Sequence, residues 1–189
     1  MVASSLTSVG QASDTPVSPD TARILDAIEK SRSKRTPADL DAARVLNALG
    51  DRAYKKRNYG AAFTAYSNSY PNHPNARAYI MTGDAHWRGV VRYQELEARK
   101  RAHGRPPCSW DNSYFAHDLA LDVAQHHEVG LALAARENDR RFMQSALYRR
   151  ARESAACLQA MARHYEAEPP AACVDVARLR RCLGSPLIK

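Results

Sequence analysis

Apolar residues recur along this chain every three to four positions, which is the spacing of one face of an α-helix. The clearest example is the stretch 43–74. Its first half carries apolar side chains at Leu46, Leu49 and Tyr54, and its second half resumes the spacing at Tyr59. A polar run, KKRN, separates the halves, and two prolines close the second. The pattern predicts two helices folded against each other.

Two helix start signals precede this stretch. Ser18-Pro19-Asp20 and Thr36-Pro37-Ala38-Asp39 each combine a capping hydroxyl, an early proline and an acid near the positive end of the helix dipole. Gly and Pro predict a loop after residue 102. The apolar spacing after this loop predicts a helix from Asp111 or Asn112 to about Asn138, a long helix over 139–168, and a short helix over 172–183.

Composition favours an all-α protein, because β-branched residues are sparse while Ala, Leu and Arg are abundant. The chain has 189 residues, enough for one domain with a sizeable core. No apolar run of about 18 residues predicts a membrane-spanning helix. We expect an antiparallel helical stack with a flexible tail over 1–17 and a single domain over 18–189. That domain divides into a repeat-like part, 18–102, and a helical hairpin with a last short helix, 108–184.

The stretch 43–74 resembles a tetratricopeptide repeat, a helix–turn–helix unit of 34 residues. The family's early Trp position holds Leu46 and its late small position holds Ser69. A small Gly and Ala fall where two helices come close. The resemblance rests on the Leu–Gly pair, the aromatics, the small Ala and the closing Pro, which are Leu49, Gly50, Tyr54, Tyr59, Ala62, Tyr66 and Pro74.

A second, degenerate repeat begins near Asn75. The sequence GDAHW that ends at Trp87 echoes the sequence GDRAY that ends at Tyr54, at an offset of 33 residues. Its second arm would be 93–102, which lacks the small and aromatic positions of the family. The alternative is that Trp87 lies inside one long helix that ends near Arg101.

In tetratricopeptide arrays the first helices of successive repeats line a concave groove that holds an extended peptide. The resemblance therefore implies a partner-binding groove in this chain. Its residues do not match the clamp of two Lys, two Asn and an Arg found in members that bind chaperone tails. The alternative is that Tyr54 and Trp87 pack between helices as core. The implied groove positions are Arg44, Asn47, Asp51, Tyr54, Lys55, Arg77, Ile80, Asp84, Trp87 and Arg88.

Four cysteines, Cys108, Cys157, Cys173 and Cys182, contain no CxxC pair, which argues against a zinc site. Residues equidistant from the turn of an antiparallel helical hairpin face each other, and this geometry predicts Cys157–Cys182 and Cys108–Cys173 bonds. Disulfides would imply an oxidising compartment, such as the periplasm or the cell exterior. The alternative is four reduced, buried thiols in a cytoplasmic protein.

One polar stripe has the composition of a chemical site. Asp118, Asp122 and His126 lie four residues apart and share a helix face, where they could hold a metal or support acid–base chemistry. The alternative is a solvated face opposite the apolar stripe. The chain contains none of the GxGxxG, GxxxxGK[ST], GxSxG or HExxH patterns, so no enzyme class and no cofactor are predicted.

The net charge of +8 permits affinity for nucleic acid or an anionic surface, although the basic residues are scattered. We expect a non-enzymatic protein- or peptide-binding scaffold. The bias of Arg over Lys fits a GC-rich bacterial genome, and the predicted disulfides favour the cell envelope or secretion. Residues 1–17 do not read as a signal peptide, so a signal would already have been removed. The alternatives are a nucleic-acid or anionic-surface binder and, third, a metal-dependent enzyme.

Overall fold

The computed structural model describes residues 17–102, 111–167 and 176–182, together with Gly184, Pro186 and Ile188. Within these residues every regular element is a helix, which confirms the predicted all-α class. None of these helices is both long and apolar enough to cross a membrane. The elements are α1 Pro19–Arg32, α2 Pro37–Lys55, α3 Tyr59–Asn72, α4 Ala76–Ala102, α5 Asp111–Arg136, α6 Arg140–Met143, α7 Ala146–Ala167 and α8 Val176–Arg181.

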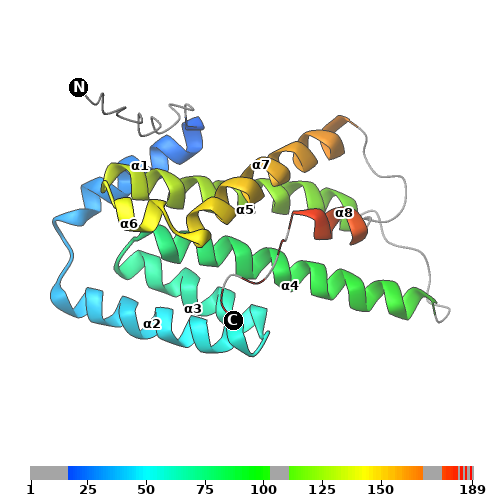
Figure 1. The fold of residues 1–189 in the computed structure, drawn as a ribbon, viewed down its shortest axis with the longest axis horizontal. Coiled ribbons are helices and arrows are strands. Elements are labelled where there is room, and N and C mark those ends of the chain that lie inside the picture. Colours follow the sequence, from blue (N-terminus) through cyan, green and yellow to red (C-terminus); the bar gives the residue numbers. More distant parts are fainter. Residues whose placement is uncertain are drawn as a thin grey trace, which may run out of the picture.

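The helices form a stack in which chain neighbours are also neighbours in space. Helix α2 packs on α3, α3 on α4, α4 on α5, and α5 on α7. Figure 1 shows the long helices α4 and α5 running through the middle of the stack, with α1 and α6 at one end and α8 beside α4. The arrangement is compatible with a helical-repeat fold.

Local capping explains where the first helices begin. The Ser18 hydroxyl accepts a hydrogen bond from the Thr21 amide at 3.2 Å. At the start of α2, Thr36 and Asp39 form a reciprocal capping box, with the Asp39 carboxylate accepting from the Thr36 amide at 2.7 Å. Asn58 caps α3 after a tight turn in which Arg57 takes a left-handed φ of 57°. Both predicted start signals and the two helices of the stretch 43–74 are therefore confirmed.

Two predicted boundaries are wrong. Helix α4 continues to Ala102, so 93–102 is not a separate second arm, and the long-helix alternative is confirmed. Its antiparallel partner is α5 instead. The helix predicted over 139–168 is divided into α6 and α7, because Asp139 caps the first and the Ser145 hydroxyl accepts from the Tyr148 amide at the start of the second. Residues 1–16 of the predicted tail lie outside the described residues.

Helix α4 supplies side chains to all three apolar clusters of the core. Trp87 packs with α5, α7 and α8. Tyr79 packs with α1 and α5, and Met81 packs with α2 and α3. Because one helix is shared by every cluster, α4 fixes the relative positions of the elements around it.

Small residues allow the closest helix contacts. A Cβ on Gly50 would lie 2.5 Å from the Tyr66 ring, so α2 and α3 meet at the glycine predicted for a close approach. A Cβ on Gly130 of α5 would lie 2.7 Å from the backbone oxygen of Ala76 in α4. A clash with backbone is relieved only by moving a helix, so Gly130 sets the spacing of α4 and α5.

A disulfide joins Cys157 of α7 to Cys182, directly after α8, with a Cα–Cα distance of 5.4 Å. This confirms one of the two predicted bonds and is compatible with an oxidising compartment. Cys108 and Cys173, the other predicted pair, lie outside the described residues.

We expect Gly130→Ala to lower the free energy of unfolding by about 1–3 kcal/mol, because the added methyl forces α4 and α5 apart. Urea unfolding followed by far-UV circular dichroism measures this. The matched control is Gly60→Ala, at a helical position with nothing within 4 Å of the new Cβ, which should leave stability unchanged or raise it slightly. Equal midpoints for Gly130→Ala and the unsubstituted protein would contradict the proposed contact.

Replacing Cys157 and Cys182 together by Ala should lower the free energy of unfolding by about 3 kcal/mol, because the bond closes a loop with a sequence separation of 25. Denaturant unfolding without reductant measures the loss. If the double variant is as stable as the parent, the bond does not constrain the unfolded chain in solution.

Candidate functional site

A buried charge network lies at the centre of the predicted groove. Asp84 accepts a hydrogen bond from the Tyr54 hydroxyl and another, of 2.8 Å, from Nε of Arg88. The two charged residues are each 6% exposed. Burial raises the pKa of Asp84, while the Arg88 guanidinium and the Tyr54 hydroxyl oppose that rise. The network ties the end of α2 to the middle of α4.

A second network also joins α2 to α4, through residues that precede those of the first network in both helices. Asp51 of α2 accepts from Nη2 of Arg77 at 2.7 Å and from the Tyr66 hydroxyl at 2.6 Å. Burial, together with the bonded Asp51 carboxylate, raises the pKa of Tyr66 far above its ordinary value. Asp51 and Arg77 are half-buried, so this network is partly accessible from solvent.

Five of the predicted groove positions are buried in the structure. Trp87 is 1% exposed, and its indole N–H donates to the Leu179 backbone oxygen of α8 at 3.1 Å. Ile80 is also buried, as are the three residues of the charge network. These side chains pack between helices, which was the alternative left open for Tyr54 and Trp87. The positions that keep some exposure are Arg44, Asn47, Asp51, Lys55 and Arg77.

The end of the chain accounts for part of this burial. After α8, Gly184 contacts α4 and Ile188 packs on a cluster built by α2, α3 and α4. Nη2 of Arg88 donates to the Gly184 backbone oxygen at 3.2 Å. Gly184 has a φ of +52°, and a Cβ there would lie 1.9 Å from Nη2 of Arg150 in α7. The left-handed φ therefore favours glycine at this point, and a side chain there would also have to displace the Arg150 guanidinium.

Farther along, Ile188 packs against an apolar cluster built by α2, α3 and α4. The rim of that cluster carries two aromatic side chains, Tyr59 and Phe63, and one aliphatic side chain of α7, Leu147. We call the surface of this cluster on which Ile188 packs the groove. The residues buried beneath that surface are Tyr54, Ala62, Tyr66, Met81 and Ala85.

Sequence reasoning missed Arg150, Gly184 and Ile188 as site residues. Gly184 directly follows the short helix predicted over 172–183, a position where glycine indicates only the end of a helix. The sequence pattern does not indicate the contacts of Arg150 and Ile188, because these contacts join segments far apart in the chain and periodicity reports only on local structure.

Two of the three residues of the polar stripe on α5 lie together, with Nδ1 of His126 3.6 Å from Oδ1 of Asp122. Nδ1 of His126 lies 2.8 Å from the Asp122 backbone oxygen, and Nδ1 of His86 lies 3.3 Å from Asp122 Oδ2. Asp118 instead pairs with His117 at 3.0 Å. Burial alone would raise the pKa of Asp122. Contacts with His86 and the charge of His126 outweigh burial and hold this pKa below its ordinary value. Among the described residues, no group of three or more His, Cys, Asp or Glu is placed to hold a metal.

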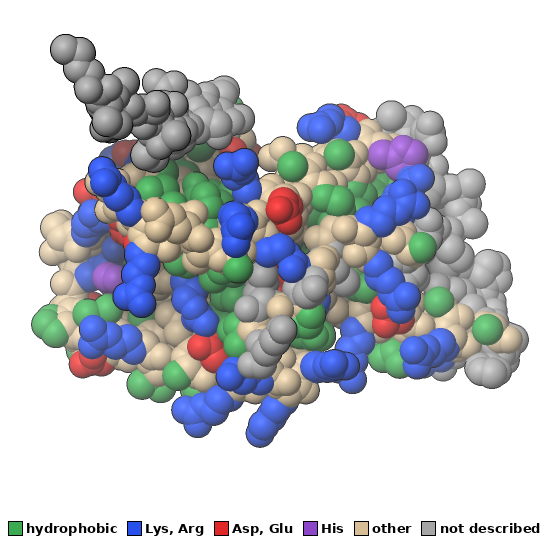
Figure 2. All heavy atoms as spheres, in the orientation of Figure 1, with side chains coloured by type: hydrophobic (Ala, Val, Ile, Leu, Met, Phe, Trp, Pro, Cys, Tyr) green, Lys and Arg blue, Asp and Glu red, His purple; other side chains and the backbone are tan. Residues whose placement is uncertain are grey.

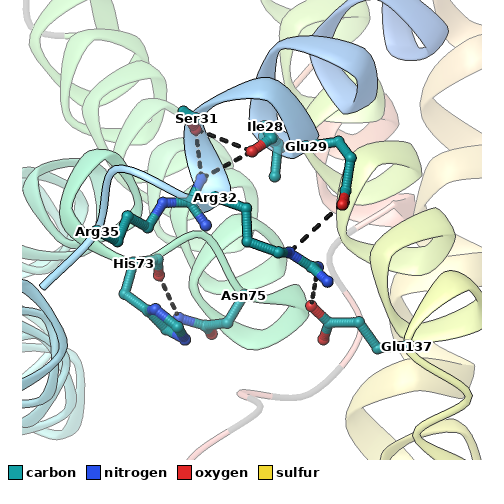
Figure 3. Close-up of polar contacts among 8 residues, drawn as sticks. All are labelled: Ile28, Glu29, Ser31, Arg32, Arg35, His73, Asn75 and Glu137. Atoms are coloured by element: carbon teal, nitrogen blue, oxygen red, sulfur yellow. Dashed lines mark hydrogen bonds and ion pairs between the residues drawn. The ribbon is translucent and has the colours of Figure 1, made fainter. Parts of the chain in front are cut away.

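A cleft of about 580 Å³ lies where α1 ends near the α3–α4 link and the end of α5. Arg32 bridges Glu29 and Glu137, at 3.5 and 3.1 Å, and Arg35 donates to the Ile28 backbone oxygen at 3.0 Å (Figure 3). Burial and the neighbouring Arg32 lower the pKa of Arg35. Arg32 and Arg35 thus connect the ends of neighbouring elements, so the residues of this cleft serve the packing of the helices.

Comparison of the chain with protein-family models, curated proteins and solved structures finds no match. The function therefore has to be argued from the residues of this chain.

Beneath the α5 stripe, His127 is 1% exposed, and a Cβ on Gly83 would lie 3.0 Å from its Cδ2. Burial, and then the charge of His126, lower the pKa of His127 to about 3. In the unfolded chain the pKa of a histidine is about 6.5. Below that pH the unfolded state binds the extra proton, so the stability this residue contributes is present above about pH 6.5 and is lost as pH falls toward 3.

Between pH 7 and pH 5 we expect this effect to cost about 2 kcal/mol of unfolding free energy. His127→Leu should remove about that much of the pH dependence. Urea titrations at the two pH values measure it, with His73→Gln as a control that removes a half-exposed imidazole. The same pH dependence in His127→Leu and in the parent would show that His127 is not the neutral buried group described above.

Proposed function

We propose that this protein is a non-enzymatic protein- or peptide-binding scaffold of the tetratricopeptide-repeat type. The observation that carries the proposal is the pair of contacts made by Gly184 with Arg88 and by Ile188 with the apolar cluster, which are contacts that a peptide ligand could make. The resemblance of 43–74 to the repeat supports the architecture. The Cys157–Cys182 bond supports a place in the periplasm or outside the cell.

The groove recognises a chain segment in three ways. Arg88 bonds a backbone oxygen, and its contact with Asp84 holds the guanidinium in position before any ligand arrives. The left-handed φ at Gly184 favours a residue without a side chain. The aromatic-rimmed cluster accepts an aliphatic side chain four positions farther on, as Ile188 follows Gly184. Affinity comes mainly from the apolar anchor, and register comes from the glycine and the backbone bond.

A partner in trans would have to displace the chain's own segment. We therefore expect a labelled peptide of residues 183–189, LGSPLIK, to bind a protein truncated after Cys182 at least about tenfold more tightly than it binds the full chain. Fluorescence anisotropy measures both affinities. The same peptide with Asp in place of Ile188 should lose at least about tenfold in affinity, because it would place a carboxylate in the apolar cluster.

Two matched pairs make this test specific. Tyr59→Ala in the truncated protein should weaken peptide binding, whereas Tyr93→Ala, at a 57% exposed position of α4, should not. In the full chain Gly184→Ala should release the segment and raise affinity for added peptide, whereas Pro186→Ala, at an exposed position, should leave it unchanged. Equal binding of the peptide and a scrambled version to the truncated protein would refute the groove.

A further inference from the structure

A basic cleft of about 510 Å³ opens beside the groove, between the α2–α3 turn and α4. Figure 2 shows Lys and Arg side chains spread over the whole face that it draws, including the part formed by α4. The charged residues that line the cleft are Lys56, Arg57, Arg88, Arg92, Glu95 and Arg99.

The positive charge of this cleft is not balanced by the acidic residues nearby. Glu95 already accepts from Nε of Arg180 at 2.6 Å, and Arg88 is paired with Asp84. Across the part of the chain that the structure describes, the other four basic side chains have no carboxylate within ion-pair distance. They are Lys56, Arg57, Arg92 and Arg99.

Backbone contacts fix the position of the Arg92 side chain and of the α2–α3 turn. Nη1 of Arg92 donates to the Arg57 backbone oxygen at 2.7 Å, which ties α4 to the turn. The turn is itself closed by the Arg57 amide, which donates to the Tyr54 backbone oxygen at 2.8 Å. Arg88, Arg92 and Arg99 follow at helical spacing on one face of α4. Four uncompensated cations around a fixed cleft form a site for an anionic ligand.

We propose that this cleft binds the acidic side chains of the protein segment that enters the groove. Arg88 and Tyr59 both line the cleft. Arg88 also bonds the Gly184 backbone oxygen, and Tyr59 packs on the same apolar cluster as Ile188. One extended ligand can therefore reach both the groove and the cleft. The inference rests on the proposed function, because it assigns the charge of the groove's partner. Arg bound to a carboxylate makes short, charge-assisted hydrogen bonds, often two at a time.

The chain's own segment leaves the cleft's charges unused. Residues 183–189, LGSPLIK, contain no Asp or Glu. An acidic partner would therefore gain ion pairs that the internal segment does not make, which gives it a basis for displacing that segment. The groove and the cleft together specify an extended segment with an aliphatic anchor and neighbouring carboxylates.

The test uses the full-length protein and a fluorescein-labelled hexaglutamate peptide in low salt. Arg57→Gln with Arg99→Gln should weaken binding at least about tenfold, because two charge-assisted contacts are lost. The control, Arg140→Gln with Arg141→Gln, makes the same change of charge at exposed positions of α6 and should alter binding less than about twofold. Lys56→Gln alone gives a milder loss in the same direction if the double variant proves unstable.

Equal weakening by the cleft variant and the control, or no weakening by either cleft variant, would overturn the site. A six-nucleotide oligo-dT tested in parallel decides the ligand class. If it binds more tightly than hexaglutamate and its binding depends on Arg57 and Arg99, the cleft serves nucleic acid and the acidic-peptide proposal is wrong. Failure of the groove itself would appear separately, as loss of the LGSPLIK result, since that peptide carries no acidic side chain.

Discussion

The buried carboxylate of Asp84 is the constraint on which the groove depends. A charge inside a protein is tolerated only when its partners are in place, and removal of one partner typically costs several kcal/mol. Here the partners come from α2, through Tyr54, and from the next turn of α4, through Arg88. Arg88 also bonds the C-terminal segment. The need to satisfy one carboxylate thus fixes the α2–α4 spacing and places a donor where an extended chain can use it.

Local features of the chain could be predicted because they depend on residues close in sequence. The hydroxyl caps at Ser18 and Thr36 and the polar turn between α2 and α3 are of this kind. The Cys157–Cys182 bond could be predicted because an antiparallel hairpin relates positions by simple reflection about its turn. The break between α6 and α7 was missed, because Ser145 looks like any exposed helical residue until its side chain caps Tyr148.

The burial of five predicted groove positions could not be predicted, for a different reason. The repeat pattern places side chains of its first helices toward a concave surface, and it contains no information about what else covers that surface. In this chain α8 lies over Trp87, and the C-terminal segment reaches Arg88. Both contacts join residues that are more than 90 positions apart. Contacts between segments distant in sequence likewise hid Arg150 and Ile188, whereas Asp51 and Arg77, from the two predicted repeats, form an ion pair with each other.

The disulfide has a consequence for competition at the groove. Cys182 is anchored to α7, and Gly184 follows it after one intervening residue, so the C-terminal segment starts from a fixed point beside its own site. A ligand on so short a tether acts at an effective concentration of about millimolar or more. A free segment of equal intrinsic affinity would occupy the groove only above that concentration. The disulfide therefore sets the affinity that a partner needs to displace the segment. Weak peptides do not reach that affinity even when abundant, whereas a partner with additional contacts can.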